Sequence, residues 1–404
     1  MEDPLRRMLA SLRKRLACGC LAAFALGFVA PAAPARAAET PDQLPAFLSE
    51  TGPAAFIGKT VEESLRLIEA MVNAAGGVAG RQIHFVVTDP QSNPTVAIQL
   101  FNGLQSSGVT ALFGPGYTAE CNALYELIRN GPVAYCIASG IHPAPGSFMF
   151  SGGVATSNLA LALATYLRAS GWHKIAEISS TDSSGADLEK SFDDALSVPD
   201  NRSLSLVARE HFALADSSVA AQVARMKSAT PDIAIVWTSG TGFGTVLRGM
   251  SDGGLATPVV GGYGNMVRAQ IAQYRSFLPA TLLFPGILGM APATGVPAAV
   301  HAAQDRYFRA YAKAGTKPDL PGALAWDPTL LILDAYRANG WAATAEQIRA
   351  WIASQHAWPG VNGVYDFVKY PQRGLGIESA EIFRWDPQTS DFVPISKPGG
   401  APLR

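Results

Sequence analysis

Apolar residues along this chain change their spacing at regular intervals. Over residues 83–87 they alternate with other residues, which indicates a strand. Over 61–72 they recur every three or four residues, which indicates an amphipathic helix, and Gly76-Gly77 follows as a helix-ending signal. Such changes of period predict a mixed α/β protein.

The same alternation of strand and helix continues along most of the chain. Further strands are predicted at 109–113, 132–137, 174–179, 204–210, 233–237 and 258–261, and further helices at 94–107, 119–129, 159–170, 186–196, 219–229, 244–253, 300–314, 328–339 and 344–354. Strands that alternate with helices favour parallel sheets covered on both faces. So many units exceed one typical sheet, and we predict two doubly wound parallel-sheet lobes.

Composition excludes several classes of protein. The chain has 404 residues, of which 48% are hydrophobic and 16% charged, and its formal net charge is −1. So little charge argues against a disordered chain. A nucleic-acid-binding protein would need a basic face, so no nucleic-acid partner is expected.

Residues 1–37 resemble an export signal. A basic segment precedes the apolar run Leu16–Val29, which is short for a membrane span, and a small-residue cleavage site ends at Ala37. Pro31 and Pro34 oppose the alternative, an N-terminal membrane helix. We predict cleavage near Ala37 and a periplasmic product.

Two further features of this segment concern the export route and the attachment of a lipid. Arg6-Arg7 leaves open whether the general or the twin-arginine route is used. Cys18 and Cys20 lack the leucine that a lipoprotein signal places three residues earlier, so no lipid anchor is predicted. Without the signal, 25 basic and 30 acidic residues remain, and the product is mildly acidic.

Two cysteines, Cys121 and Cys136, remain after cleavage. An oxidising compartment permits a disulfide between them. Two buried thiols are an equal alternative, because sequence does not give their distance.

Signatures of known chemistry are sparse. Gly114 to Ala119 imitates a dinucleotide fingerprint, but the next strand ends without the acidic residue that would hold a ribose. The six histidines are scattered, and no zinc spacing or nucleophile elbow is present. We therefore expect no cofactor, no metal and no catalytic residue.

Aromatic and hydroxyl residues gather where strands are predicted to meet helices. At such positions open α/β sheets bind their ligands. Together they suit a cleft that stacks an apolar body and holds one polar end. The aromatic residues are Phe56, Tyr117, Trp237, Tyr263 and Trp326, and the hydroxyl residues are Thr118, Ser139, Thr238 and Ser239.

Several motifs in order resemble type I periplasmic solute-binding proteins, especially the branched-chain amino-acid receptors of ABC importers. The motifs are the Thr-Gly-Pro turn at 51–53, the Asn-x-x-Gly-Gly segment at 73–80, Asp89 with Asn93-Pro94, Gly114-Pro115, and the segment 364–374. The resemblance covers nearly the whole chain after residue 37.

The resemblance implies two lobes joined by three crossovers that close on a small ligand. It assigns 41–152 with 284–355 to the first lobe, and 153–283 with 356–404 to the second. It also implies a monomer that delivers ligand to permease subunits in the inner membrane and catalyses no reaction.

Carried over position by position, the resemblance places a ligand carboxylate in the first lobe. Thr118 falls where a family hydroxyl and its amide contact that carboxylate. Ala138, Ser139 and Gly140 fall on the second gripping turn, where Gly140 replaces the usual threonine. Backbone and hydroxyl donors can hold such a group without a buried cation.

Departures from the family lie in the second lobe. Tyr263 stands where amino-acid receptors place an acidic residue for the ligand's ammonium. Ser184 and Ser239 replace tyrosines, and Trp237 replaces a small residue. Burying an ammonium without a carboxylate is costly, so we hypothesise an aromatic or aliphatic acid that lacks it.

Alternatives to this ligand and to this function stay open. The alignment could be shifted, or Glu120 or Asp182 could serve as the acid, which would restore an amino-acid ligand. A sensor that signals to a membrane partner would share the same cleft. An exported enzyme on this fold is a third alternative.

Overall fold

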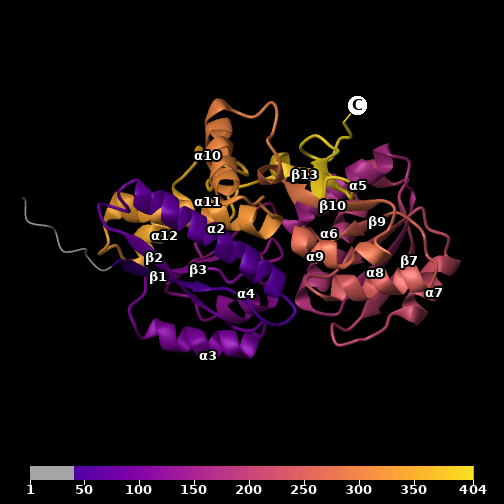
Figure 1. The fold of residues 1–404 in the computed structure, drawn as a ribbon, viewed down its shortest axis with the longest axis horizontal. Coiled ribbons are helices and arrows are strands. Elements are labelled where there is room, and N and C mark those ends of the chain that lie inside the picture. Colours follow the sequence, from indigo (N-terminus) through magenta and orange to yellow (C-terminus); the bar gives the residue numbers. More distant parts are fainter. Residues whose placement is uncertain (1–40, 404) are drawn as a thin grey trace, which may run out of the picture. The chain divides into compact units, whose positions relative to one another are not determined.

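The computed structural model describes residues 41–403, so the predicted signal segment 1–37 and its cleavage site lie outside the described residues. Two large sheets organise the described chain, and a third sheet has two strands only (Figure 1). We call the five-stranded sheet with its helices the first lobe and the seven-stranded sheet with its helices the second lobe. The predicted fold class, two α/β lobes, is confirmed.

The first-lobe sheet is parallel throughout and has the strand order β2-β1-β3-β4-β5. Its strands are β1 (Asp42–Phe47), β2 (Ile83–Thr88), β3 (Ala111–Phe113), β4 (Val133–Cys136) and β5 (Met149–Ser151). Leu112 packs among residues of α3 (Pro94–Gln105) and α4 (Thr118–Tyr125), whereas its neighbour Phe113 packs edge-on against Phe85 in the other core cluster. Successive side chains therefore enter two different cores, as expected of a sheet covered on both faces.

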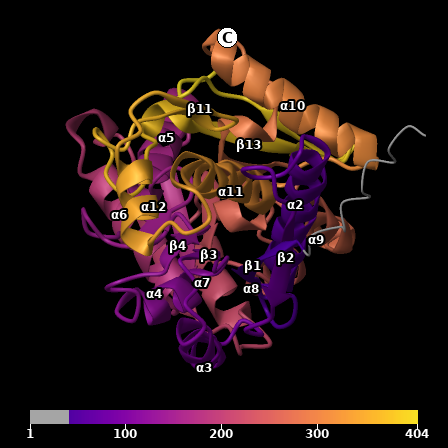
Figure 2. The same ribbon diagram turned by 90° about the vertical axis from the view of Figure 1, so that its left-hand side faces the viewer.

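Helices from distant parts of the chain cover the second face of this sheet. They are α2 (Ala55–Ala74), α11 (Leu320–Asn339) and α12 (Ala345–Ala353), and α10 (Ala298–Ala314) packs beside α2 (Figures 1 and 2). Asn93 caps α3 as predicted, because its side chain accepts the Thr95 N–H at 2.9 Å.

The second-lobe sheet has the order β14-β13-β10-β9-β8-β6-β7. Its parallel strands are β6 (Lys174–Ser180), β7 (Ser205–Phe212), β8 (Ile233–Trp237), β9 (Val259–Gly261) and β10 (Leu282–Ile287). Two antiparallel strands, β13 (Ala380–Asp386) and β14 (Asp391–Pro394), extend one edge. Its helices are α5 (Thr156–Ala169), α6 (Ser183–Leu196), α7 (Ala220–Ser228), α8 (Gly242–Asp252) and α9 (Arg268–Gln273).

The chain passes between the two sheets three times. It leaves the first sheet after β5, leaves the second after β10, and returns to the second at β13 after the hairpin of β11 (Trp358–Gly360) and β12 (Gly363–Tyr365). Our predicted ranges gave residues 284–287 to the first lobe, but these residues pair with β13 in the second. The other predicted limits of the lobes stay a prediction.

Helix α11 begins earlier than the sequence predicted. We expected its start at Pro328, but the helix begins at Leu320 and contains Pro328. Pro321 lies in the first turn, where a missing N–H costs nothing. The extra turns bring Leu320, Pro321 and Leu324 to the strand ends of the two sheets, where the candidate site lies.

Between residues 41 and 403, none of the helices combines the length and the apolar character needed to cross a membrane.

Candidate functional site

A small cavity of about 20 Å³ lies where the carboxyl ends of both sheets meet. Its walls follow four strands: Gly116 to Thr118 come after β3, Ile137 and Ala138 after β4, Ser239 after β8, and Tyr263 after β9. Parallel α/β sheets bind ligands at this edge. A larger hollow of about 430 Å³ lies among α2, α10, α11 and β11, away from these strand ends.

Five of the ten residues predicted for the site line this cavity. They are Tyr117, Thr118, Ala138, Ser239 and Tyr263. They lie together because residues that follow neighbouring parallel strands come out at one edge of a sheet.

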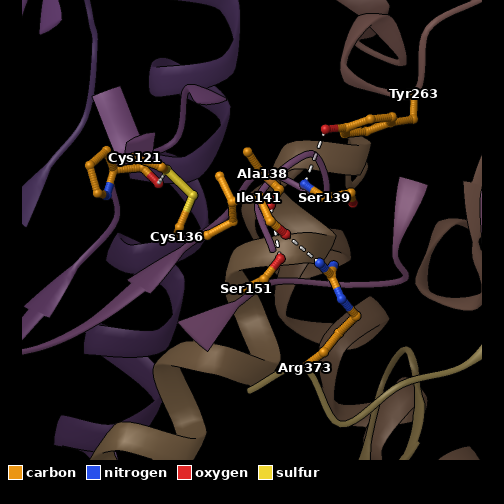
Figure 3. The surroundings of a disulfide bond; sticks show 9 residues. Cys121, Cys136, Ala138, Ser139, Ile141, Ser151, Tyr263 and Arg373 are labelled. Atoms are coloured by element: carbon orange, nitrogen blue, oxygen red, sulfur yellow. Dashed lines mark hydrogen bonds between the residues drawn. A yellow bond between two sulfur atoms is a disulfide. The ribbon is translucent and has the colours of Figure 1, made fainter. Parts of the chain in front are cut away.

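Ser139 and Gly140 lie on the turn that follows Ala138. The Ser139 N–H donates to the Tyr263 hydroxyl at 3.0 Å, a contact between the two lobes (Figure 3). The Ser139 hydroxyl is buried and has no hydrogen-bond partner within residues 41–403. A side chain added at Gly140 would place its Cβ 3.5 Å from the Thr118 hydroxyl, so Gly140 and Thr118 are neighbours. This turn, whose first residue Ala138 lines the cavity, therefore carries a partner-free hydroxyl and backbone donors beside it.

Thr118 is the first residue of α4, after Tyr117 at the N-cap. The first amides of a helix have no partner inside the helix. They point along the positive end of the helix dipole, which favours a negative group. Thr118 and the turn at 138–140 together can hold a carboxylate.

Asp182 is saturated by its own lobe and by one contact from the other. It accepts hydrogen bonds from Ser180 at 2.6 Å, from Ser184 at 2.9 Å and from the Gly185 N–H at 3.2 Å. The Tyr117 hydroxyl donates to it from the first lobe at 2.8 Å, and burial together with the Asp182 charge raises the pKa of Tyr117. Asp182 thus caps α6 and ties the lobes together. Ser184 touches this network rather than the cavity.

Glu120, the other acid considered from the sequence, lies behind the cavity wall. Its carboxylate is fully buried and accepts a hydrogen bond from Ser49 at 2.5 Å. Burial raises the pKa of Glu120 to about 7. Its second oxygen has no partner in the described part of the chain.

Asp187 is an acid that our sequence analysis missed. One oxygen lies 2.5 Å from His142 Nε2 across the lobes, and the other is buried without a partner among the described residues. A Cβ added at Gly140 would lie 3.1 Å from that second oxygen. The signal was available, because Asp187 follows Ser184 by three residues and so shares its face of α6.

Trp237 and Phe56 do not line the cavity. Trp237 is fully buried in β8, and its ring packs against Phe192 with centroids 6.2 Å apart. Phe56 is partly exposed on α2, and its neighbour Ile57 faces the cavity instead. Adjacent helix residues point in different directions, so a shift of one position changes which side chain faces the site.

Apolar residues that the sequence did not single out form much of the cavity wall. They are Ile57, Ile137, Leu320, Pro321 and Leu324. An apolar wall with a few polar donors at one end is typical of small-molecule sites. The arrangement suits a ligand with an apolar body and an anionic end.

A disulfide joins Cys121 and Cys136, whose Cα atoms are 5.9 Å apart (Figure 3). The question that sequence left open is thus answered in favour of the bond. Cys121 belongs to α4 and Cys136 ends β4. The bond therefore links the two first-lobe segments that carry Thr118 and the turn at 138–140.

Comparison with known proteins agrees with this architecture. The sequence profile of the periplasmic binding protein family matches residues 43–391. No curated protein sequence matches the chain.

Solved structures give the same result at low identity. An extracellular ligand-binding receptor from Rhodopseudomonas palustris HaA2 is 20% identical, with a TM-score of 0.75 over 88% of this chain and 100% of its own. The branched-chain amino acid substrate-binding protein LivJ from Streptococcus pneumoniae, in complex with isoleucine, is 20% identical, with a TM-score of 0.71 over 88% and 100%. A solute-binding protein of an R. palustris ABC transporter, in complex with benzoate, is 18% identical, with a TM-score of 0.74 over 90% and 97%. At such identities the likeness establishes the fold alone.

Proposed function

Because the chain belongs to the periplasmic binding protein family, we propose that it is the solute-binding receptor of an ABC importer. It captures a small carboxylate-bearing ligand between its lobes and delivers it to permease subunits in the inner membrane. Its site of action is the periplasm, after removal of residues 1–37, and it acts as a monomer without catalysis.

One observation carries the carboxylate part of the proposal. Two first-lobe segments supply donors at or beside the cavity: Thr118 at the start of α4 lines it, and the Ser139 hydroxyl, next to the lining residue Ala138, has no partner within residues 41–403. Buried hydroxyls are normally paired, so an unpaired one beside a cavity is suited to a ligand acceptor. A carboxylate supplies two such acceptors.

The body of the ligand is an aromatic or aliphatic group in this proposal. The wall of isoleucine, leucine and tyrosine side chains supports it, as does the saturated state of Asp182. The partner-free oxygen of Asp187 favours the amino-acid alternative, because it could accept an ammonium beside Gly140. Neighbours on the same fold were solved with isoleucine and with benzoate, so both classes belong in the test.

Closure of the lobes has to accompany binding. The cavity of about 20 Å³ holds roughly one water molecule, whereas isoleucine or benzoate needs several times that volume. We infer that the ligand enters when the lobes separate and that Tyr263 moves from Ser139 to make room. Hinge motion of this kind is common in two-lobe binding proteins.

Isothermal titration calorimetry tests the proposal directly. Purified protein is titrated with benzoate, octanoate and leucine, and native mass spectrometry identifies any molecule retained through purification. We expect saturable binding of at least one acid that lacks an ammonium. Tight leucine binding without binding of the other two would contradict the ammonium-free ligand. Failure of all three, with no retained molecule, would contradict the carboxylate class.

A further inference from the structure

The turn at residues 138–141 has its carbonyl groups fixed from behind. The Ala138 carbonyl accepts a hydrogen bond from the Ser151 hydroxyl at 3.0 Å. The Ile141 carbonyl accepts one from Arg373 Nη2 at 2.6 Å (Figure 3). With these carbonyls engaged on one side, the turn is oriented by partners that do not line the cavity.

The amide side of the same turn meets Tyr263, a residue that lines the cavity. The Ser139 N–H donates to the Tyr263 hydroxyl, and Figure 3 shows Tyr263 and Arg373 on opposite sides of the turn. Backbone N–H groups presented together in this way form a concave site that attracts negative charge.

Arg373 itself carries a buried charge that the charge of Asp187 stabilises, but without a direct ion pair among residues 41–403. The residue is 8% exposed, and its second hydrogen bond goes to the Gly153 carbonyl at 3.4 Å. Within residues 41–403 no carboxylate forms an ion pair with it. Burial lowers the pKa of Arg373 to about 10, so it remains protonated at neutral pH. A buried cation without a directly paired counter-ion is costly, and the cost falls further when an anion binds nearby.

We propose that Arg373 determines the charge specificity of the site: its buried cation, held behind the 138–141 turn, makes the N–H groups of that turn select an anionic ligand head. The inference rests on the proposed function, because it concerns the same cavity. Arg373 does not touch the ligand in this arrangement. It acts through the turn that it orients and through its charge.

Asp187 acts on the pKa of Tyr263 in the opposite direction to Arg373. It lies on the second lobe, where one of its oxygens contacts His142. The pKa of Tyr263 is raised to about 12 by burial first and then by Asp187, while the Ser139 and Gly140 amides and Arg373 act to lower it. The Tyr263 oxygen thus lies at the turn and is subject to both charges. Once ionised, it is an anion placed where the ligand carboxylate is expected.

A titration at position 263 tests the proposal without any ligand. Tyr263 is replaced by a fluorinated tyrosine that ionises at lower pH, and its ionisation is followed by fluorine NMR in the full-length mature protein. Arg373→Gln is expected to raise the pKa of residue 263 by about 1, since it removes a nearby positive charge. Asp187→Asn is expected to lower it. Arg373→Lys should restore it, because the charge is kept.

Two further variants separate charge from geometry. Ser151→Ala removes the other carbonyl anchor of the turn but no charge, and it should leave the pKa of residue 263 nearly unchanged. An unchanged pKa in Arg373→Gln, or an equal rise in Ser151→Ala, overturns the proposal. If Arg373→Gln does not fold, Arg373→Lys decides: a pKa that rises by about 1 despite the retained charge also overturns it.

A ligand pair then separates this inference from the proposed function. Benzoate and its neutral amide, benzamide, are titrated into the wild type, Arg373→Gln and Arg373→Lys. The preference for benzoate should fall about tenfold in Arg373→Gln and be kept in Arg373→Lys. A preference unchanged in Arg373→Gln contradicts the inference. If the wild type binds neither probe, benzoate fails as a ligand of the proposed receptor, while the titration at residue 263 still decides the role of Arg373.

Discussion

The two sides of the cavity are built differently. On the first-lobe side, the donors are the start of α4 and the turn after β4, and a disulfide joins these two segments. On the second-lobe side, Ser239 and Tyr263 contribute side chains from the segments after β8 and β9. The first side combines backbone donors with the hydroxyls of Thr118 and Ser139, whereas the second side offers side chains alone. Loss of the first-side hydroxyls is therefore expected to weaken the binding of every acid, and substitutions on the second side are expected to change which acid binds.

Removing the disulfide should give the largest change in free energy, and it should make the first-lobe side of the cavity less rigid. Cys121→Ser with Cys136→Ser frees a loop whose ends are 15 residues apart, which is expected to lower the free energy of unfolding by about 3 kcal/mol. Urea unfolding measures the loss. Reductant should bring the wild type to the same stability and leave the double variant unchanged, and equal stability of the two oxidised proteins would contradict the prediction.

Glu120 tests whether a buried ionised carboxylate on the first-lobe side lowers the stability of the folded protein. Its pKa in the folded protein, about 7, lies above the ordinary 4.5. Folding therefore takes up a proton, and this contribution to stability is complete below pH 4.5 and is lost as the pH rises through 7. Glu120→Gln should match the wild type near pH 4.5 and exceed its unfolding free energy by about 2 to 3 kcal/mol at pH 8.

Urea unfolding at the two pH values checks the Glu120 prediction. Glu126→Gln is the matched control, because Glu126 follows α4 on the surface and, among residues 41–403, pairs only with exposed Arg129. It should change the stability little at either pH. A Glu120→Gln variant that is less stable than the wild type at pH 8 would show that the ionised carboxylate is stabilising.

Removal of the two first-lobe hydroxyls sharpens the comparison at the level of affinity. Thr118→Ala with Ser139→Ala is expected to weaken binding of the tightest acid in the calorimetric panel about thirtyfold, or by about 2 kcal/mol. Ser239→Ala, on the second-lobe side, should weaken the same acid less. Unchanged binding by the double variant would remove both residues from the site.

Tyr117→Phe should give the smallest effect, because it breaks one contact between the lobes and leaves the donors in place. Loss of the hydrogen bond to Asp182 is expected to weaken binding about tenfold, or by about 1.4 kcal/mol, by disfavouring closure. Small-angle scattering should show a larger open fraction. Ser184→Ala keeps the contact between the lobes and is the control, so an equal loss in both variants would argue against a role in closure.

Much of the fold could be predicted from the sequence, because its signals are local. Alternating periods place most strands and helices, and the residues after β3 and β4 fall at the cavity because parallel strands end at one edge. Trp237 shows the limit of this reasoning. All five residues of β8 are buried, so no alternation reveals which side chains face the site and which face the core.

The missed site residues depend on long-range packing. Leu320 and Leu324 reach the cavity only because α11 continues through Pro328, a residue that ordinarily marks a helix start or a break. Asp187 approaches Gly140 only because the two lobes meet there. The spacing of residues places Asp187 on the same face of α6 as Ser184, but it shows neither the meeting of the lobes nor the continuation of α11.

The bond between Cys121 and Cys136 also has a practical meaning for anyone who measures binding. Where the bond is absent, part of the binding free energy is used to order α4 relative to the end of β4. Where the bond is present, these two segments are already held together. We therefore expect the same polypeptide to bind its ligand with two affinities, one for each oxidation state of these cysteines. Protein prepared in a reducing cytosol or kept in dithiothreitol is expected to bind its ligand more weakly. Dissociation constants are therefore comparable only between samples whose free thiol content has been measured.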